Sequence, residues 1–170
     1  MPANRKENRK FGDDRSIVLD RVNRRLLECL IVEPRSSLAG LARKLGISRP
    51  SVTERLQRLE EQGVLAGFRV EIEPSALGLP LTAYVRVRPG LRQLENVAEL
   101  ARNTPEIVEC HRITGDDCFL MKVHVGSVQH LESILDGFLA HGQTVTSIVQ
   151  SSPVPWRQPP LPIDHDEVSP

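Results

Sequence analysis

The stretch LARKLGISRPSVTERLQRLEEQGVLAGF, residues 41–68, limits the possible folds of the chain more than any other segment. Two segments with helical periodicity are separated here by only Gly-Ile-Ser. Gly46 can adopt the left-handed conformation that ends a helix, and Ser48 can cap the next one. Pro50 falls in the first turn of that helix, where its missing N–H has no helical partner. The stretch therefore predicts two helices joined by a short turn.

The second of these helices has two unlike sides. Val52, Leu56 and Leu59 recur at helical spacing and form an apolar stripe. Asp20 and Ser37 are good N-caps for two earlier helices against which that stripe can pack, as in a helix-turn-helix domain. The opposite side carries Arg49, Ser51, Thr53, Glu54, Arg55 and Arg58. Its cations can reach phosphates or guanine edges, so this side is the predicted DNA-binding surface, although a three-helix bundle with a solvated polar face has the same spacing.

After Gly67 the pattern changes to strands alternating with helices. Residues 63–74 predict a strand or a small hairpin. The later segments predict strands at 81–89, 106–115, 118–126 and 143–150, and helices at 91–102 and 127–140. This βαββαβ order is typical of a ferredoxin-like antiparallel sheet with both helices on one face. Because the other face must be covered, and a second copy of the sheet is the simplest cover, we expect a homodimer.

The predicted fold class is α+β, with an N-terminal winged helix-turn-helix domain followed by a ferredoxin-like βαββαβ domain. The expected parts are a mobile basic arm at 1–16, the helix-turn-helix domain at 17–66, a linking strand and connector at 67–79, the βαββαβ domain at 80–152 and a Pro-rich tail at 153–170. The six prolines of the tail prevent it from continuing a helix or a sheet for long.

The net charge of zero is the sum of two unlike halves. Residues 1–62 hold 14 Lys and Arg against 9 Asp and Glu, whereas residues 63–170 hold 8 against 13. The front half is therefore suited to a polyanion such as DNA. The chain has no run of about 18 apolar residues and no apolar block behind its basic N-terminus, so we expect a cytoplasmic protein without a membrane partner.

Three cysteines and five histidines invite comparison with metal sites. The tempting set is Cys110, His111, Cys118 and His124. Their spacing matches no zinc pattern, and alternate strand residues point to opposite faces, so we expect no metal, no cofactor and reduced thiols. Asp116 and Asp117 could be read as an acid–base pair, but neighbours in a turn usually diverge. With no activated Cys-His pair recognisable either, we expect no catalytic residues.

Five motifs occur in order along the chain. They are LD..N..LL..L at 19–30, R.S...LA...GIS...V..RL.RLE..GV..GF at 35–68, P..LG at 74–78, TG...FL.KV at 114–123 and TVTSIV at 144–149. Together they resemble the Lrp/AsnC, or feast/famine, family of transcription factors over about residues 19–152. The resemblance implies a DNA-reading domain joined to a βαββαβ domain that dimerises through its sheet, often builds octamers and senses amino acids at the seams between dimers.

The resemblance also implies roles for single residues. Recognition-helix positions fall on Arg49, Ser51, Thr53, Glu54 and Arg55, and effector positions fall on Gly115, Asp116, Asp117, Cys118, Thr144, Thr146 and Ser147. Two departures from the family pattern matter. Asn23 replaces a usual aspartate, and Cys118 stands where many members have an aspartate. The second departure leaves the identity of the effector, and its existence, open.

The predicted function is regulation of transcription by sequence-specific DNA binding, in response to an amino acid or related metabolite bound between dimers. The predicted partners are double-stranded DNA, that effector, and further copies of the chain in a dimer and in an octamer or other larger oligomer. The alternative is a small-molecule-sensing oligomer or an enzyme subunit whose helical domain serves assembly only, because fold alone does not fix function.

Overall fold

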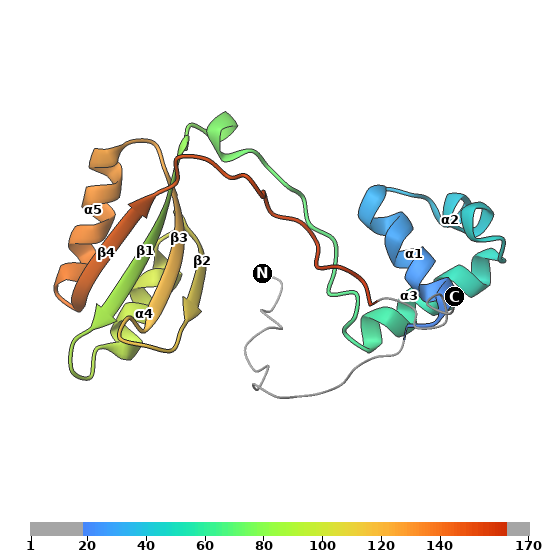
Figure 1. Cartoon of the computed structure of the whole chain (residues 1–170), viewed down its shortest axis with the longest axis horizontal. Helices are drawn as coiled ribbons and strands as arrows, with labels where there is room; N and C mark the ends of the chain where they lie inside the picture. Colours follow the sequence, from blue (N-terminus) through green and yellow to red (C-terminus); the bar gives the residue numbers. More distant parts are fainter. Residues whose placement is uncertain (1–18, 163–170) are drawn as a thin grey trace, which may run out of the picture. The chain divides into compact units, whose positions relative to one another are not determined.

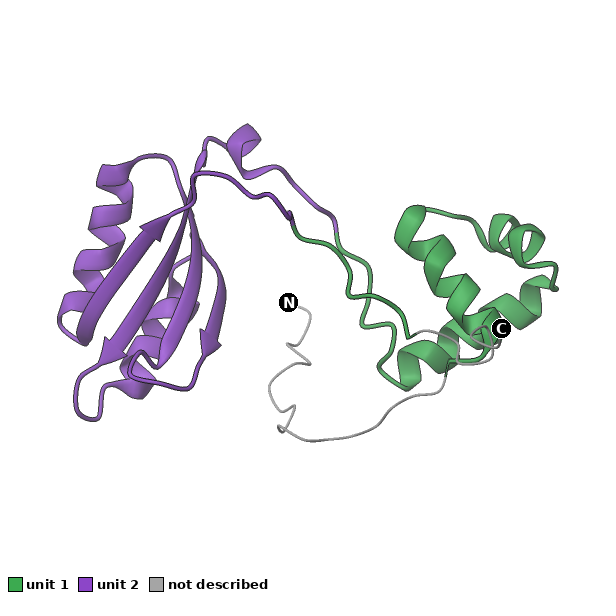
Figure 2. Cartoon of the chain, in the orientation of Figure 1, with its two compact units in different colours: residues 1–69, 156–170 green, residues 70–155 purple. Residues whose placement is uncertain are grey.

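The computed structural model describes residues 19–162. The chain divides into two compact units, one of residues 1–69 with 156–170 and one of residues 70–155 (Figure 2). The expected arm at 1–16 and the end of the expected tail lie outside the described residues. The first unit is helical, and the second is built on a sheet (Figure 1).

The helical unit contains α1 (Arg21–Val32), α2 (Leu38–Leu45) and α3 (Arg49–Glu61). Each helix begins at the predicted N-cap, because the side chains of Asp20, Ser37 and Ser48 each accept a hydrogen bond from the backbone N–H three residues on. Gly46 ends α2 in the left-handed conformation, with φ 69°. The turn between α2 and α3 is therefore as short as the sequence predicts.

The core of the helical unit is apolar and contains residues from all three helices. Its buried members are Leu26, Leu27, Leu30, Leu41, Ala42, Leu45, Val52 and Leu59. Leu19, Leu56 and Leu161 are among the half-buried residues packed against it. Burial of this set holds α3 by one side only, which leaves its other side available.

The strand or hairpin predicted at 63–74 is absent from the structure. Residues 66–73 are neither helix nor strand, and η1 (Pro74–Leu77) is a single 3-10 turn. Phe68, Val70 and Ile72 alternate as a strand would, but their side chains are exposed. An alternating segment forms a strand only where a neighbouring strand accepts its hydrogen bonds, and the described part of one chain offers none here.

The sheet unit contains β1 (Leu81–Pro89), α4 (Leu94–Asn103), β2 (Ile107–Arg112), β3 (Phe119–Val125), α5 (Val128–Leu139) and β4 (Gly142–Ile148). The strands lie in the order β2-β3-β1-β4, and every neighbouring pair is antiparallel. This order confirms the predicted ferredoxin-like unit. Figure 1 shows α4 and α5 packed against the sheet.

One face of the sheet holds the core of this unit. Its buried members are Ala83, Val85, Val87, Phe119, Met121, Val123 and Val125 from the strands, and Val97, Ala101, Leu131 and Phe138 from α4 and α5. Leu94 and Val128 share the helical spacing of these buried residues, but they are 39% and 44% exposed. Each is the first residue of its helix, so its side chain tilts toward the N-terminal end, where no earlier helical turn packs beside it.

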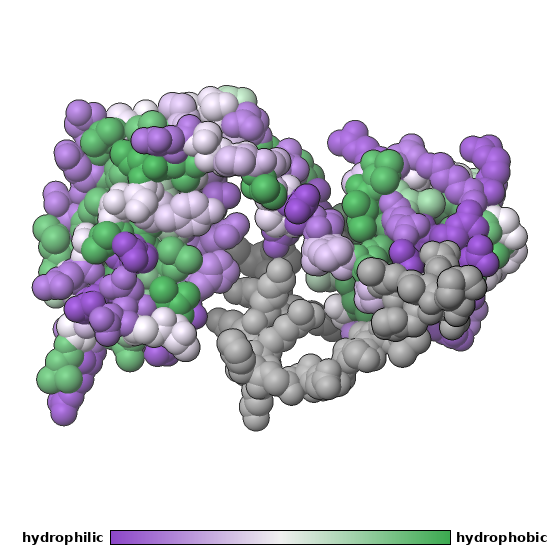
Figure 3. Space-filling model, viewed as in Figure 1, coloured by the Kyte–Doolittle hydropathy of each residue, from purple (hydrophilic) through white to green (hydrophobic). Residues whose placement is uncertain are grey.

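The other face of the sheet carries polar and apolar side chains side by side. The strand register places Thr82, Tyr84, Arg86, Arg88, Leu120, Lys122, His124, Val145 and Ser147 on this open face. Tyr84 and Val145 are 40% and 48% exposed. The surface view of the sheet unit shows the same mixture of apolar and polar patches (Figure 3).

Candidate nucleic-acid interface and effector turn

Helix α3 exposes most of the predicted DNA-binding residues, and Glu54 and Arg58 lie on the side away from its buried stripe. Val52 and Leu59 have no exposed surface, whereas Arg49, Thr53, Glu54 and Arg58 are exposed and Ser51 is half-buried. The helix has 13 residues and is therefore about 20 Å long. It is long enough to cross a DNA major groove, which is about 12 Å wide.

The exposed arginines of α3 are only weakly engaged. Within residues 19–162, Arg49 makes no ion pair, and its carbonyl accepts a hydrogen bond from the Thr53 hydroxyl at 3.2 Å. Arg58 pairs with Glu54 at 2.5 Å, but both side chains are more than 60% exposed. Exposed ion pairs one helical turn apart contribute little free energy. Arg58 can therefore exchange its carboxylate partner for a phosphate at small cost.

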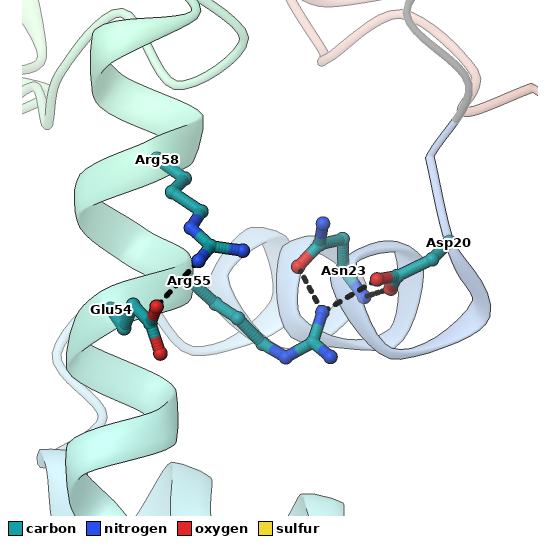
Figure 4. A network of polar contacts seen from close by, with 5 residues as sticks. All are labelled: Asp20, Asn23, Glu54, Arg55 and Arg58. Carbon is teal, nitrogen blue, oxygen red and sulfur yellow. Dashed lines mark hydrogen bonds and ion pairs between the residues drawn. The ribbon is translucent and has the colours of Figure 1, made fainter.

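Arg55 behaves differently from the other α3 arginines. Its Nη1 donates to Asp20 Oδ2 at 2.6 Å and to Asn23 Oδ1 at 3.0 Å, as Figure 4 shows. Its side chain is 28% exposed. These bonds join α3 to the first turn of α1. In this structure the guanidinium of Arg55 is therefore occupied within the protein rather than directed to a ligand.

The Asp20 carboxylate has two tasks. Its Oδ1 accepts the N–H of Asn23 and caps α1, while its Oδ2 pairs with Arg55. Partial burial raises the pKa of the Asp20 carboxyl, but the Asn23 N–H and the Arg55 guanidinium outweigh it and leave the pKa below the ordinary value. The ionised form is thus the one that the fold stabilises.

The partnership of Asp20 and Asn23 with Arg55 is not among the sequence predictions. Asp20 is predicted only as a cap, and Arg55 only as a DNA contact. The spacing held a signal, since Arg55 lies three residues after Val52 and four before Leu59, at the edge of the apolar stripe. An arginine at that edge points toward the neighbouring helix.

The predicted effector turn lies over one end of β1. Gly115 has φ 109°, a conformation that side chains rarely adopt, and lets the chain reverse between β2 and β3. Asp116 pairs with Arg88 at 3.2 Å, and Asp117 lies 3.6 Å from Arg86. The two carboxylates therefore serve as counter-ions for the open-face arginines rather than as an acid–base pair.

The structure does not bring all seven predicted effector residues together. Cys118 donates its N–H to the Val87 carbonyl, and Thr144 pairs with Val87 from the other side of β1. Two strand spacings, about 10 Å, thus separate the turn from β4. Thr144 and Thr146 lie on the helix-covered face, whereas Ser147 lies on the open face. Within one chain, therefore, the seven residues do not form a single site.

The cysteines and histidines considered as metal ligands are also spread apart. By strand register Cys110 lies on the helix-covered face and His111 on the open face. His124 shares a hydrogen bond of 3.0 Å with Thr82, and partial burial together with Lys122 lowers its pKa. Residues 19–162 contain no cluster of three potential metal ligands. No helix in that range is long and apolar enough to span a bilayer.

Comparison with known proteins identifies the two units. A winged helix-turn-helix DNA-binding model matches residues 19–66, and the Lrp/AsnC ligand binding domain model matches residues 82–159. The HTH-type transcriptional regulator LrpC of Bacillus subtilis is 31% identical over 133 residues, which cover 78% of this chain and 92% of LrpC. A regulator of the same type from Pyrococcus abyssi is 36% identical over 139 residues, with 77% and 92% covered.

Solved structures agree with these matches. The structure of B. subtilis LrpC has a TM-score of 0.75 at 30% identity, covering 79% of this chain and 96% of that one. A feast or famine regulatory protein from Mycobacterium tuberculosis, complexed with L-methionine, has a TM-score of 0.74 at 28% identity, with 82% and 97% covered.

The helix-turn-helix unit and the ligand-binding sheet unit together define a transcriptional regulator. The chain belongs to the Lrp/AsnC family. This membership supports the regulator over the alternative of a sensing oligomer or enzyme subunit with an assembly domain, and the relatives compared above are named as regulators of transcription.

Proposed function

We propose that the solvent-facing side of α3 reads DNA through Arg49, Ser51, Thr53, Glu54 and Arg58. The observation that carries this proposal is the exposure of Arg49, Thr53, Glu54 and Arg58 on a helix whose Val52 and Leu59 are fully buried. Arginines suit phosphates and guanine edges, and the small hydroxyls permit a close approach to the groove. Arg55 acts as a positioning residue that fixes the tilt of α3 on α1.

The dimer that we propose forms through the open face of the sheet. Tyr84 and Val145 supply exposed apolar surface there, and the ion pairs of Arg86 and Arg88 supply charge that a second copy can match. Two copies of α3 then address neighbouring turns of the major groove about 34 Å apart, which predicts a loosely palindromic operator. An octamer or another larger assembly, implied by the family resemblance, binds several such sites.

An amino acid is the proposed effector, bound where dimers meet. The L-methionine complex of the Mycobacterium tuberculosis relative supports this class of ligand. Asp116 and Asp117 offer acceptors for an ammonium group, and the backbone and hydroxyls near Gly115 and Thr144 offer donors for a carboxylate. The separation of the turn from β4 within one chain fits a site completed by a neighbouring copy.

The test of DNA reading uses Arg49→Ala combined with Arg58→Ala in the full chain. The matched control is Arg102→Ala, which removes one guanidinium from α4 of the sheet unit. We expect the double variant to bind a selected operator more weakly, to lose about two units of the slope of log affinity against log salt, and to keep its oligomeric state. Operator affinity and salt slope equal to those of the control would refute the docking of α3.

The test of sensing is a titration of free amino acids into the purified protein. The expected response to at least one of them is a change in assembly state by light scattering, together with a change in operator affinity. If none of the twenty alters assembly, thermal stability or operator affinity, the sensing proposal fails while the DNA-reading proposal stands.

A further inference from the structure

Residues 156–162, which we call the C-terminal strap, belong to the helical unit although they follow β4 in the sequence. At one end of the strap, Leu161 is half-buried and packs against the core of α1, α2 and α3. At the other end, the Trp156 ring lies 5.9 Å from the guanidinium carbon of Arg69. Such a cation–π contact adds to the apolar contact of Leu161. The strap is thus held at two points.

The strap lies beside a face of α1 that the three-helix core does not use. Arg24, Glu28, Ile31 and Val32 line a shallow groove together with Arg157, Gln158, Pro159, Pro160 and Leu161. The four α1 residues follow the helical spacing of one face. Ile31 and Val32 keep 45% and 84% of their surface exposed, so this face is apolar at its end and only partly covered.

The composition of the strap suits this kind of contact. Pro159, Pro160 and Pro162 have no backbone N–H, so the segment can cross a helix surface without leaving those donors unpaired. Fixed proline φ angles also reduce the conformational entropy that is lost when the segment becomes ordered. A short proline-rich segment can therefore dock with few apolar anchors.

We infer that the C-terminal strap is a second tether between the ligand-binding sheet and the DNA-reading helices. The first tether is the connection through residues 66–80. Strand β4, which carries the predicted effector residues Thr144 and Thr146, ends at Ile148, and only the seven residues 149–155 separate it from the strap. The strap contacts α1, and Arg55 joins α1 to α3. Docking of the strap thereby shortens the free linker after β4 and restricts how far the recognition helix can move from the sheet.

The docking of the strap is tested without DNA. Leu161→Asp places a charge against the apolar core, and Val154→Asp is the control because Val154 is exposed in the same proline-rich segment outside the helical unit. In Leu161→Asp we expect faster hydrogen exchange of the α1 amides and a fall of about 4–8 °C in the unfolding midpoint of the helical unit. Leu161→Met keeps an apolar side chain at this position, so its α1 exchange rates and its unfolding midpoint should stay near those of the unaltered protein. Identical exchange and midpoints in the two Asp variants would overturn the docking.

The tether role, which rests on the proposed DNA reading, is tested with a duplex selected by the unaltered protein from a random pool. Below the unfolding range, we expect Leu161→Asp to lose about tenfold in affinity for two half-sites while its affinity for one half-site stays near that of Val154→Asp. Equal losses on both duplexes would mean that the strap only stabilises the helical unit, and would overturn the tether. If the unaltered protein selects no duplex, the proposed function fails, and the exchange measurement still decides the docking.

Discussion

The helical unit and the sheet unit use their surfaces in different ways. The helical unit closes its core with residues from three helices, adds the Arg55 network, and leaves a polar side of α3 exposed. The sheet unit closes only one face, and its open face keeps Tyr84 and Val145 exposed among ion pairs. The first surface suits a polyanion, whereas the second suits another protein surface. The contrast shows that a unit can bury a full apolar core and still leave a face that another protein surface could cover.

The largest expected effect comes from destabilising the core of one unit and asking whether the other unit is affected. Phe138→Ala empties a site in the sheet unit that is 1% exposed, and we expect it to lower the free energy of unfolding of that unit by about 3–5 kcal/mol. The single Trp, Trp156, reports on the helical unit, and the single Tyr, Tyr84, reports on the sheet.

Urea unfolding followed by both fluorophores gives the result. We expect the tyrosine transition to shift and the tryptophan transition to stay in place, with Leu59→Ala giving the reverse pattern as the matched control. If the two transitions move together in either variant, the units unfold as one cooperative block and the comparison fails.

Arg55→Ala tests whether the polar network belongs to the helical unit. It removes the bonds to Asp20 and Asn23, and we expect a loss of about 1 kcal/mol in the free energy of unfolding, reduced from the value for a buried pair because Asp20 is 54% exposed. The measurement is the tryptophan-detected urea midpoint. Arg58→Ala, which removes an exposed pair of the same helix, is expected to change it by less than about half as much.

The pH dependence of stability tests the contribution of the Asp20–Arg55 pair separately. The pKa of Asp20 in the folded protein is below its ordinary value of 3.8, so its pairing stabilises the fold above that pH and loses this effect as the pH falls through the folded-state pKa. The difference in urea midpoint between the unaltered protein and Arg55→Ala should therefore be constant near neutrality and shrink in strong acid to the part contributed by the Asn23 amide, which does not titrate. A difference that does not shrink once Asp20 is protonated would show that the Asp20 charge contributes nothing and would assign the effect of Arg55 to packing and to the Asn23 bond.

The smallest expected effect concerns Glu54. Glu54→Gln removes the exposed partner of Arg58, so the free energy of unfolding should change by less than about 0.5 kcal/mol. Operator binding should become modestly weaker, because the Glu54 carboxylate, as a proposed DNA-reading group, accepts a hydrogen bond from a base and the amide that replaces it is a poorer acceptor. Glu60→Gln, near the end of the same helix, is the control. Tighter binding in Glu54→Gln would indicate that Glu54 only pairs with Arg58 and repels the phosphates, and would remove it from the proposed DNA-reading residues.

The helices and the sheet could be predicted from local chemistry. The caps at Asp20, Ser37 and Ser48 and the alternation from Leu81 to Val87 are signals within a few residues, and the structure has the corresponding elements. The strand predicted at 63–74 does not form, although its residues alternate as those of β1 do. Alternation describes two faces, but a strand also needs a neighbour, and no neighbour is encoded locally.

The site was predictable only where one helix face decided it. Exposure of Arg58 follows from its place away from Val52 and Leu59 on the helix surface, whereas Arg49 is exposed as the first residue of the helix. The engagement of Arg55 depends on Asp20, 35 residues earlier, and the burial of Leu161 depends on a core formed more than 100 residues before it. Such long-range pairings follow from the packed fold and not from periodicity.

The ion pairs between the Gly115 turn and β1 have one more consequence. Asp116 and Asp117 neutralise Arg86 and Arg88, two cations on the uncovered side of the sheet. An ammonium group that binds Asp116 or Asp117 would compete with Arg86 and Arg88 for the same carboxylates and leave these arginines without their counter-ions. Ligand binding and association of the subunits would then depend on the same four charged side chains, so a change in one would alter the affinity of the other.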